Sequence, residues 1–189
     1  MLDTFDAIRT DALDRLRLAA ASRRSPMHTP VVATADADAR VMVLRAVDSE
    51  TWTLRFHTDT RAPKVGMIEA DPRVGVLAYD KEAKLQLRLR GTGRIQRDGA
   101  AVDAAWEAST RFARRCYLGE GPGALSDMPT TGLPQAFEGR EPQDEDLLRA
   151  RAHFALLLVE VAEIDWFCLA HTGHRRALVT RTAGQWISP

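Results

Sequence analysis

The sequence predicts a mainly β protein, in which a β-barrel core carries peripheral helices. Short segments that alternate apolar and polar residues recur about every ten residues, which is typical of an antiparallel meander. Segments with the three- or four-residue apolar spacing of an amphipathic helix are few. A chain of 189 residues, of which 45% are hydrophobic, fits one domain that buries its own core.

The N-terminal segment, residues 3–22, predicts a helix that Asp3 or Thr4 caps. Its apolar side chains share one face of that helix: Phe5, Ile8, Ala12, Leu16 and Ala19. Alternating or β-branched segments follow, and we expect antiparallel strands over residues 31–34, 40–45, 52–58, 73–79, 84–96, 153–169 and 177–181.

The remaining segments predict peripheral helices and loops. We expect a short helix over residues 62–70, with Pro63 in its first turn, and a longer helix over residues 99–115, capped by Asp98. Residues 117–145 are rich in Gly, Pro and acidic residues and predict a long loop, with a short helix after it near 145–151. The chain is interpreted as a single domain with three parts: the N-terminal helix 3–22, a barrel over about 29–97 and 153–182, and a helical and loop insertion over about 99–152.

Composition and charge argue against several classes of function. The formal net charge is zero, so no global field draws the chain to nucleic acid or to an anionic membrane. The N-terminus lacks a signal-peptide pattern and no apolar run approaches the roughly 20 residues of a membrane helix, so we expect a cytoplasmic location. Two cysteines and histidines without an HExxH pattern predict no metal site. Rossmann, P-loop and G-x-S-x-G motifs are absent, and no residue is singled out as catalytic.

The segment from His57 to Lys64 runs from the end of a strand into the start of a helix, where unpaired N–H groups favour anions. Thr58 contributes a hydroxyl group, and Arg61 and Lys64 contribute positive charge. This pattern indicates an anion site, or otherwise an ordinary helix cap at Asp59 or Thr60.

Arginine residues stand at both ends of the strand over 40–45. Strand side chains alternate, so Arg40 and Arg45 lie on opposite faces unless the strand bends or bulges. Either guanidinium suits a phosphate group, and the alternative is a strand with solvated ends.

Two further positions suit a planar ring. Alternation over 84–96 places Gln86 and Arg88 on the face opposite the leucines, where an amide can donate to and accept from a ring edge, or else meet solvent. Trp166 is expected in the core or beside an aromatic cofactor, and the basic cluster after it includes His174 and Arg176.

Taken in order, these motifs resemble the pyridoxamine 5′-phosphate oxidase family. The family's Arg-x-Val-Leu-basic strand corresponds to Arg40-Val41-Met42-Val43-Leu44-Arg45. Its strand ending in aromatic-Thr-Asn/Asp before a Ser-x-Lys helix start corresponds to residues 56–64. Its Asn/Asp-Pro-x-Val motif corresponds to residues 71–74, and its Gln-Leu strand that runs into Gly corresponds to residues 86–91. The likeness is best over residues 40–91.

The resemblance implies a split β-barrel that binds FMN in a cleft between the two subunits of a homodimer. Arg40 and Lys64 would bind the FMN phosphate with support from Thr58, while Val41, Met42 and Val43 complete the first motif and His57 replaces an aromatic residue. Gln86 would meet the isoalloxazine ring, with Arg88 beside it on the same face. Trp166 is the counterpart of a family tryptophan near the flavin, and Arg45 and Arg176 are candidates for the substrate side.

The chain also departs from the family pattern. Ala62-Pro63-Lys64 replaces Ser-Arg-Lys, and Arg61 is the candidate to compensate for the missing arginine. The C-terminal Arg-Leu-His that holds pyridoxal phosphate has no clean counterpart, so the substrate stays open. The expected function is an FMN-dependent oxidoreductase. The alternatives are a non-catalytic module that binds flavin or haem and an antiparallel barrel without a cofactor.

Overall fold

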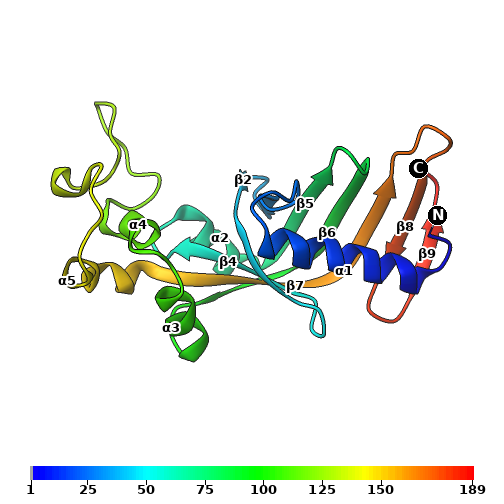
Figure 1. Cartoon of the computed structure of the whole chain (residues 1–189), viewed down its shortest axis with the longest axis horizontal. Coiled ribbons are helices and arrows are strands. Elements are labelled where there is room, and N and C mark those ends of the chain that lie inside the picture. Colours follow the sequence, from blue (N-terminus) through cyan, green and yellow to red (C-terminus); the bar gives the residue numbers. More distant parts are fainter. Residues whose placement is uncertain (1) are drawn as a thin grey trace.

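The computed structural model describes residues 2–189 and contains one antiparallel nine-stranded sheet. Its main path runs in the order β2-β1-β5-β6-β7-β4-β3, and β8 and β9 extend it from the C-terminal part of β7. The strands are β1 Val31–Thr34, β2 Ala39–Val41, β3 Leu44–Asp48, β4 Thr53–Asp59, β5 Arg73–Asp80, β6 Leu85–Gln96, β7 Phe154–Cys168, β8 Arg175–Val179 and β9 Gly184–Ile187. The sheet curls, α1 lies across it and the other helices lie toward one end (Figure 1), so the prediction of a mainly β core with peripheral helices is confirmed.

The two long central strands, β6 and β7, hold the sheet together. They pair along their whole lengths, with a bulge between Arg90 and Gly91. A Cβ at Gly91 would lie 2.0 Å from the carbonyl oxygen of Glu160, so only glycine lets the two backbones approach this closely.

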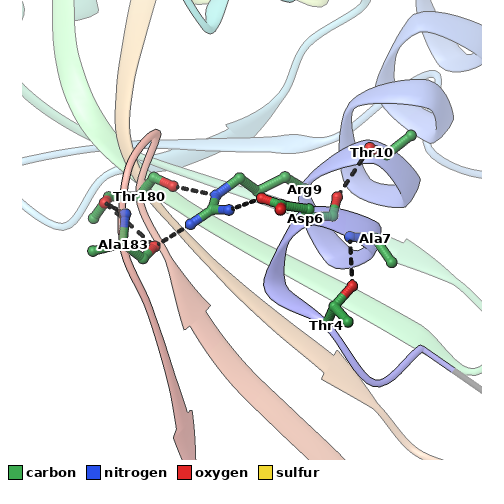
Figure 2. A network of polar contacts seen from close by, with 7 residues as sticks. All are labelled: Thr4, Asp6, Ala7, Arg9, Thr10, Thr180 and Ala183. Atoms are coloured by element: carbon green, nitrogen blue, oxygen red, sulfur yellow. Dashed lines mark hydrogen bonds and ion pairs between the residues drawn. The ribbon is translucent and has the colours of Figure 1, made fainter.

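Helix α1, Phe5–Ala21, covers the inner face of the sheet with the apolar stripe that the sequence predicts. Thr4 caps it, because its Oγ1 accepts a hydrogen bond from Ala7 N at 3.2 Å. Figure 2 shows Arg9 reaching from this helix to the turn between β8 and β9, where it donates to Thr180 O and Ala183 O, each at 2.7 Å. The N- and C-termini therefore lie at the same end of the molecule (Figure 1).

The insertion forms a second small core at the other end of the molecule (Figure 1). It contains α3 Ala100–Glu107, α4 Arg111–Arg114 and α5 Asp144–Leu147, with 3₁₀ turns over Arg115–Leu118, Gln135–Phe137 and Arg149–His153. Its apolar residues pack on Phe154 at the start of β7, and they include Val102, Trp106, Leu118, Phe137 and Leu147. Short helix α2, Pro63–Ala70, packs between β1 and β6.

The continuous helix predicted over 99–115 is wrong, because the chain breaks it after α3. Thr110 has an extended backbone and its side chain accepts from Ala113 N at 3.2 Å, which starts α4 as a new helix. The cap of α3 is Gly99, with φ of 93°, and Asp98 does not serve as the cap.

Two strand predictions also need correction. The segment 40–45 is not one strand: β2 pairs with β1, β3 pairs with β4, and Met42 and Val43 cross between them. At this crossing Met42 N donates to Pro30 O and Leu44 N donates to His28 O. The strand predicted over 177–181 is not the last, since β9 follows it after a tight turn.

Within residues 2–189, we find no helix with the length and apolar character needed to cross a membrane.

Candidate functional site

A cavity of about 400 Å³ lies between the broken strand pair β2–β3, the end of β4, the start of α2 and the insertion. Its basic and polar lining consists of Arg40, Arg45, His57, Thr58, Asp59 and Lys64. The rest of the lining is Val41, Met42, Val43, Ala113, Cys116, Tyr117 and Pro122. The structure thus brings eight of the residues singled out in the sequence to one place.

The break between β2 and β3 explains how Arg40 and Arg45 reach the same cavity. In a continuous strand these two side chains would project to opposite faces. Because Met42 and Val43 cross from one strand partner to another, the alternation is interrupted and both arginines border the cavity. The chain therefore bends between Arg40 and Arg45.

Lys64 stands in the first turn of α2 and is half-buried. Burial lowers its pKa, and the positive charge of Arg40 lowers it further. No acidic side chain in the described chain forms an ion pair with Lys64. Arg40 and Lys64 thus border one cavity, while the negative charges of Asp59 and Asp38 oppose the lowering of the Lys64 pKa.

Arg40 is held in place by its own strand pair. Its guanidinium pairs with Asp38 and donates to Thr34 Oγ1 at 3.2 Å and to Val32 O at 3.3 Å. These bonds fix the side chain while it borders the cavity. The side chain of Asp38 is 62% exposed, so solvent screens this ion pair in part.

Arg61 does not line this cavity. It pairs with buried Asp59, with Nη2 at 2.7 Å from Oδ2, and its Nη1 donates to Gly119 O at 2.8 Å. Arg61 therefore ties the start of α2 to the insertion. Neither Asp59 nor Thr60 caps α2, whose cap position is Ala62 without a side-chain bond. Asp59 Oδ1 instead accepts from Arg61 N at 2.8 Å.

His57 and the insertion form the apolar wall of the cavity. The His57 ring packs edge-on against Phe154 at 4.9 Å between centroids, and Tyr117 packs against the same phenyl ring at 5.3 Å. Burial, followed by the charges of Arg45 and Arg55, lowers the pKa of His57 to about 4, so the ring is neutral near pH 7. Its Nε2 is buried and has no hydrogen-bond partner in the described chain.

The insertion also contributes to this cavity, which the sequence did not predict. Ala113, Cys116, Tyr117 and Pro122 come from a region without periodicity, and no motif marks them. Tyr117 is held against Trp106 and Phe154, and burial raises its pKa further above neutrality. Tyr117 therefore remains a neutral wall residue.

Gln86, Arg88 and Arg176 lie elsewhere, on the outer face of the sheet. Arg88 is the cross-strand neighbour of Asp165, and Phe167 stands between Gln86 and Arg176. The side chain of Asp165, 1% exposed, pairs with Arg88 and with Arg176, whose Nη2 lies at 2.8 Å. One buried carboxylate thus holds two guanidinium groups side by side on this face.

Trp166 faces the opposite side of the sheet, toward α1. It is 4% exposed, and its Nε1 donates to Asp11 Oδ2 at 3.1 Å. Trp166 does not line the cavity, and its side chain belongs to the main core.

Comparison with protein families gives one match. The family model described as pyridoxamine 5′-phosphate oxidase matches residues 24–153, which contain every residue that lines the cavity. No curated protein matches the chain.

Solved structures share the fold at low sequence identity. A pyridoxamine 5′-phosphate oxidase-related, FMN-binding protein from Nostoc punctiforme is 23% identical over 100% of both chains, with a TM-score of 0.75. PhzG from Burkholderia lata, in complex with tetrahydrophenazine-1-carboxylic acid, is 15% identical over 95% of this chain and 92% of its own, with a TM-score of 0.67. A protein related to general stress protein 26 from Clostridium acetobutylicum is 11% identical over 96% and 98%, with a TM-score of 0.52.

Proposed function

Because the chain belongs to the pyridoxamine 5′-phosphate oxidase family, we propose that it binds FMN and acts as an FMN-dependent oxidoreductase in the form of a homodimer. One observation carries this proposal: Arg40 and Lys64, from separate elements, border one cavity, and Lys64 has no acidic partner in residues 2–189. The FMN-binding description of the Nostoc protein of the same fold agrees with it.

The donors around the cavity fit a phosphate dianion. A guanidinium and an ammonium group form short charge-assisted hydrogen bonds to phosphate oxygens, and the Thr58 hydroxyl adds a neutral donor. A dianion between Arg40 and Lys64 would also offset the repulsion that lowers the pKa of Lys64. The first turn of α2 presents the positive end of the helix dipole on the same side.

Bound FMN would supply the hydride or electron transfer, and the chain would bind and orient it. In this proposal Arg40, Lys64 and Thr58 hold the phosphate, while Val41 at the end of β2 and the crossing residues Met42 and Val43 lie beside it. Neutral His57 and Tyr117 exclude water from the wall next to Phe154. Arg61 contributes indirectly, through its bonds to Asp59 and Gly119.

The contacts predicted for Gln86 and Arg88 at the ring, and for Arg176 on the substrate side, require a second copy of the chain. These side chains lie on the outer face of β6 and β8 and do not line the cavity of their own chain. We therefore place them beside the cofactor that is held by the other copy, where Asp165 fixes the two guanidinium groups. Trp166 does not share this face, and its contact with flavin stays a prediction.

The test of the cofactor is the absorption spectrum of the purified protein and a titration with FMN. Wild-type protein should bind FMN, and Lys64→Ala together with Arg40→Ala should weaken binding by about a hundredfold or more, since each removes a charge-assisted bond. Lys81→Ala, at an exposed position outside the cavity, is the matched control and should bind FMN normally.

Two results would contradict parts of this proposal. If the double variant binds FMN as tightly as the Lys81→Ala control, the phosphate does not lie between Arg40 and Lys64. If FMN binds but is neither reduced nor reoxidised with any donor tried, NADPH and vitamin B6 compounds included, the result contradicts the enzymatic part of the proposal and favours a non-catalytic flavin module.

A further inference from the structure

A short glycine-rich segment of the insertion, residues 119–123, lies beside the cavity proposed for FMN, and we name it the glycine strap. Its Pro122 lines the cavity, as do Cys116 and Tyr117 just before it. A second hollow, of about 380 Å³, is lined by all five strap residues and by residues 130–133. Because Pro122 borders both hollows, the strap is a wall between them, with open space on its far side.

The strap packs closely on the start of α2, the element that carries Lys64. A Cβ atom added at Gly121 would lie only 3.2 Å from Arg61 Cβ. At Gly123, where φ is 87°, an added Cβ would lie 3.4 Å from Pro63 Cγ. Glycine therefore lets the strap lie against α2, and a larger residue at position 121 would push it away.

Arg61 bonds the strap to the barrel. Its Nη1 donates to Gly119 O at 2.8 Å and its Nη2 donates to Tyr117 O at 3.5 Å. Asp59, whose side chain is 7% exposed, holds the same guanidinium through Nε at 2.9 Å and Nη2 at 2.7 Å. Within residues 2–189, the hydrogen bonds that reach residues 117–123 from outside the insertion come from Arg61 alone.

We propose that the glycine strap is a movable cover of the cofactor cavity and that Arg61 is the positioning residue that holds it closed. Arg61 stands between Thr58 and Lys64 in the chain, so the same segment that would bind the phosphate also fixes the cover. The second hollow gives the strap room to move outward. The inference rests on the proposed function in so far as FMN is the molecule covered.

The test measures how fast FMN enters and leaves, by stopped-flow fluorescence of the flavin. A cover that opens limits both steps, so loosening it should accelerate both binding and release. Arg61→Gln should raise both rate constants by about fivefold or more, since the strap loses a charged donor. Asp59 without its partner would repel the phosphate and slow binding, so faster binding identifies the strap and not the change of charge.

Two further variants sharpen the test. Gly121→Val displaces the strap without changing any charge and should have the same effect, and it decides the test if Arg61→Gln does not fold. Combined with Arg61→Gln it should add little, because both changes open one cover. Arg73→Gln is the matched control: Arg73 likewise pairs with an aspartate two residues earlier, Asp71, but is 78% exposed and should change either rate by less than about twofold.

A second measurement does not require FMN. Glutamyl endopeptidase cuts after Glu120 only when the strap leaves its place, so native-state cleavage there should be about fivefold faster in Arg61→Gln than in Arg73→Gln. Equal cleavage in these two variants would overturn the role of Arg61. Faster FMN release without faster binding would show that the strap adds affinity and is not a cover. A wild-type protein that binds no FMN would contradict the proposed function and the covered ligand, while cleavage at Glu120 still decides whether Arg61 holds the strap.

Discussion

At the scale of single residues, His57 should make stability depend on pH. Its pKa in the folded protein is about 4, against an ordinary value of 6.5. As the pH falls below about 6.5, the unfolded chain takes up a proton that the folded ring resists, so folding is progressively destabilised until the pH is near 4. A shift of this size has an upper limit of about 3 kcal/mol, and partial solvent access reduces the expected loss to roughly 1–2 kcal/mol.

The measurement is urea unfolding near neutral pH and again near pH 4, the pKa of His57 in the folded protein. His57→Gln should lose about 1–2 kcal/mol less than the wild-type protein between the two conditions. His171→Gln, at an exposed histidine, is the control and should follow the wild type. An unchanged pH dependence in His57→Gln would mean that the ring is solvated in the folded protein. The lowered pKa of His57 would then be wrong.

The same scale shows what the sequence could predict of the site. Arg40, Thr58 and Lys64 were identifiable because each stands in a motif with a fixed spacing, and they border one cavity. Arg61 carries the positive charge that its motif suggests, but its guanidinium pairs with Asp59, two residues earlier. The spacing of the motif does not show whether Arg61 binds this carboxylate or a phosphate. Tyr117 had no motif at all, because its neighbours come from distant segments.

At the scale of elements, the sequence predicts helix α1 but not its position on the sheet. The amphipathic stripe predicted both the helix and its buried face, since packing follows directly from the 3.6-residue period. The stripe does not show where the helix lies along the sheet. Arg9 fixes that position through its bonds to the β8–β9 turn, as Figure 2 shows.

Arg9→Ala should therefore lower the free energy of unfolding by about 1–3 kcal/mol, because the partly buried Thr180 carbonyl and the exposed Ala183 carbonyl both lose a charged donor. Arg17→Ala, on the same helix, is the matched control and should change it by less than about 0.5 kcal/mol. The side chain of Arg9 is 15% exposed and that of Arg17 is 62% exposed, which is the basis of the contrast. Equal effects of the two variants in urea unfolding would show that the turn does not anchor the helix.

Elements were predicted well where one period persists, and poorly where a local side-chain bond interrupts it. Thr110 ends the continuous helix of the insertion because its hydroxyl group caps the next helix. Likewise, backbone bonds to Pro30 and His28 divide the segment 40–45 between two strand partners. A capping residue or an exchange of strand partner is compatible with a regular apolar pattern, so the pattern alone does not exclude it.

At the scale of the whole molecule, the fold separates the proposed phosphate cavity from the outer-face arginines of the same chain. Arg40 and Lys64 lie at the cavity, whereas Arg88 and Arg176 are held by Asp165 on another surface. If one FMN molecule contacts both sets, the two must come from different copies of the chain. A shared site of this kind is a property of the assembly, and no pattern within one sequence displays it.

Mixing two defective variants tests this arrangement. Lys64→Ala and Arg176→Gln should each bind FMN weakly as homodimers. In a mixed dimer with shared sites, one site carries both defects and the other carries neither, so random mixing should return about one quarter of all sites to wild-type affinity. Co-refolded mixtures, titrated with FMN and compared with the separate variants, give the measurement.

The control is a mixture of Lys64→Ala with Arg40→Ala, whose changes affect the same cavity. Every site in that mixture retains a defect on the phosphate side, so no recovery is expected. Recovery in the first mixture and not in the second would place Arg176 at the cofactor of the other subunit. Absence of recovery in both, with dimers present by light scattering, would mean that each chain binds its cofactor alone, and the outer-face arginines would then serve another role.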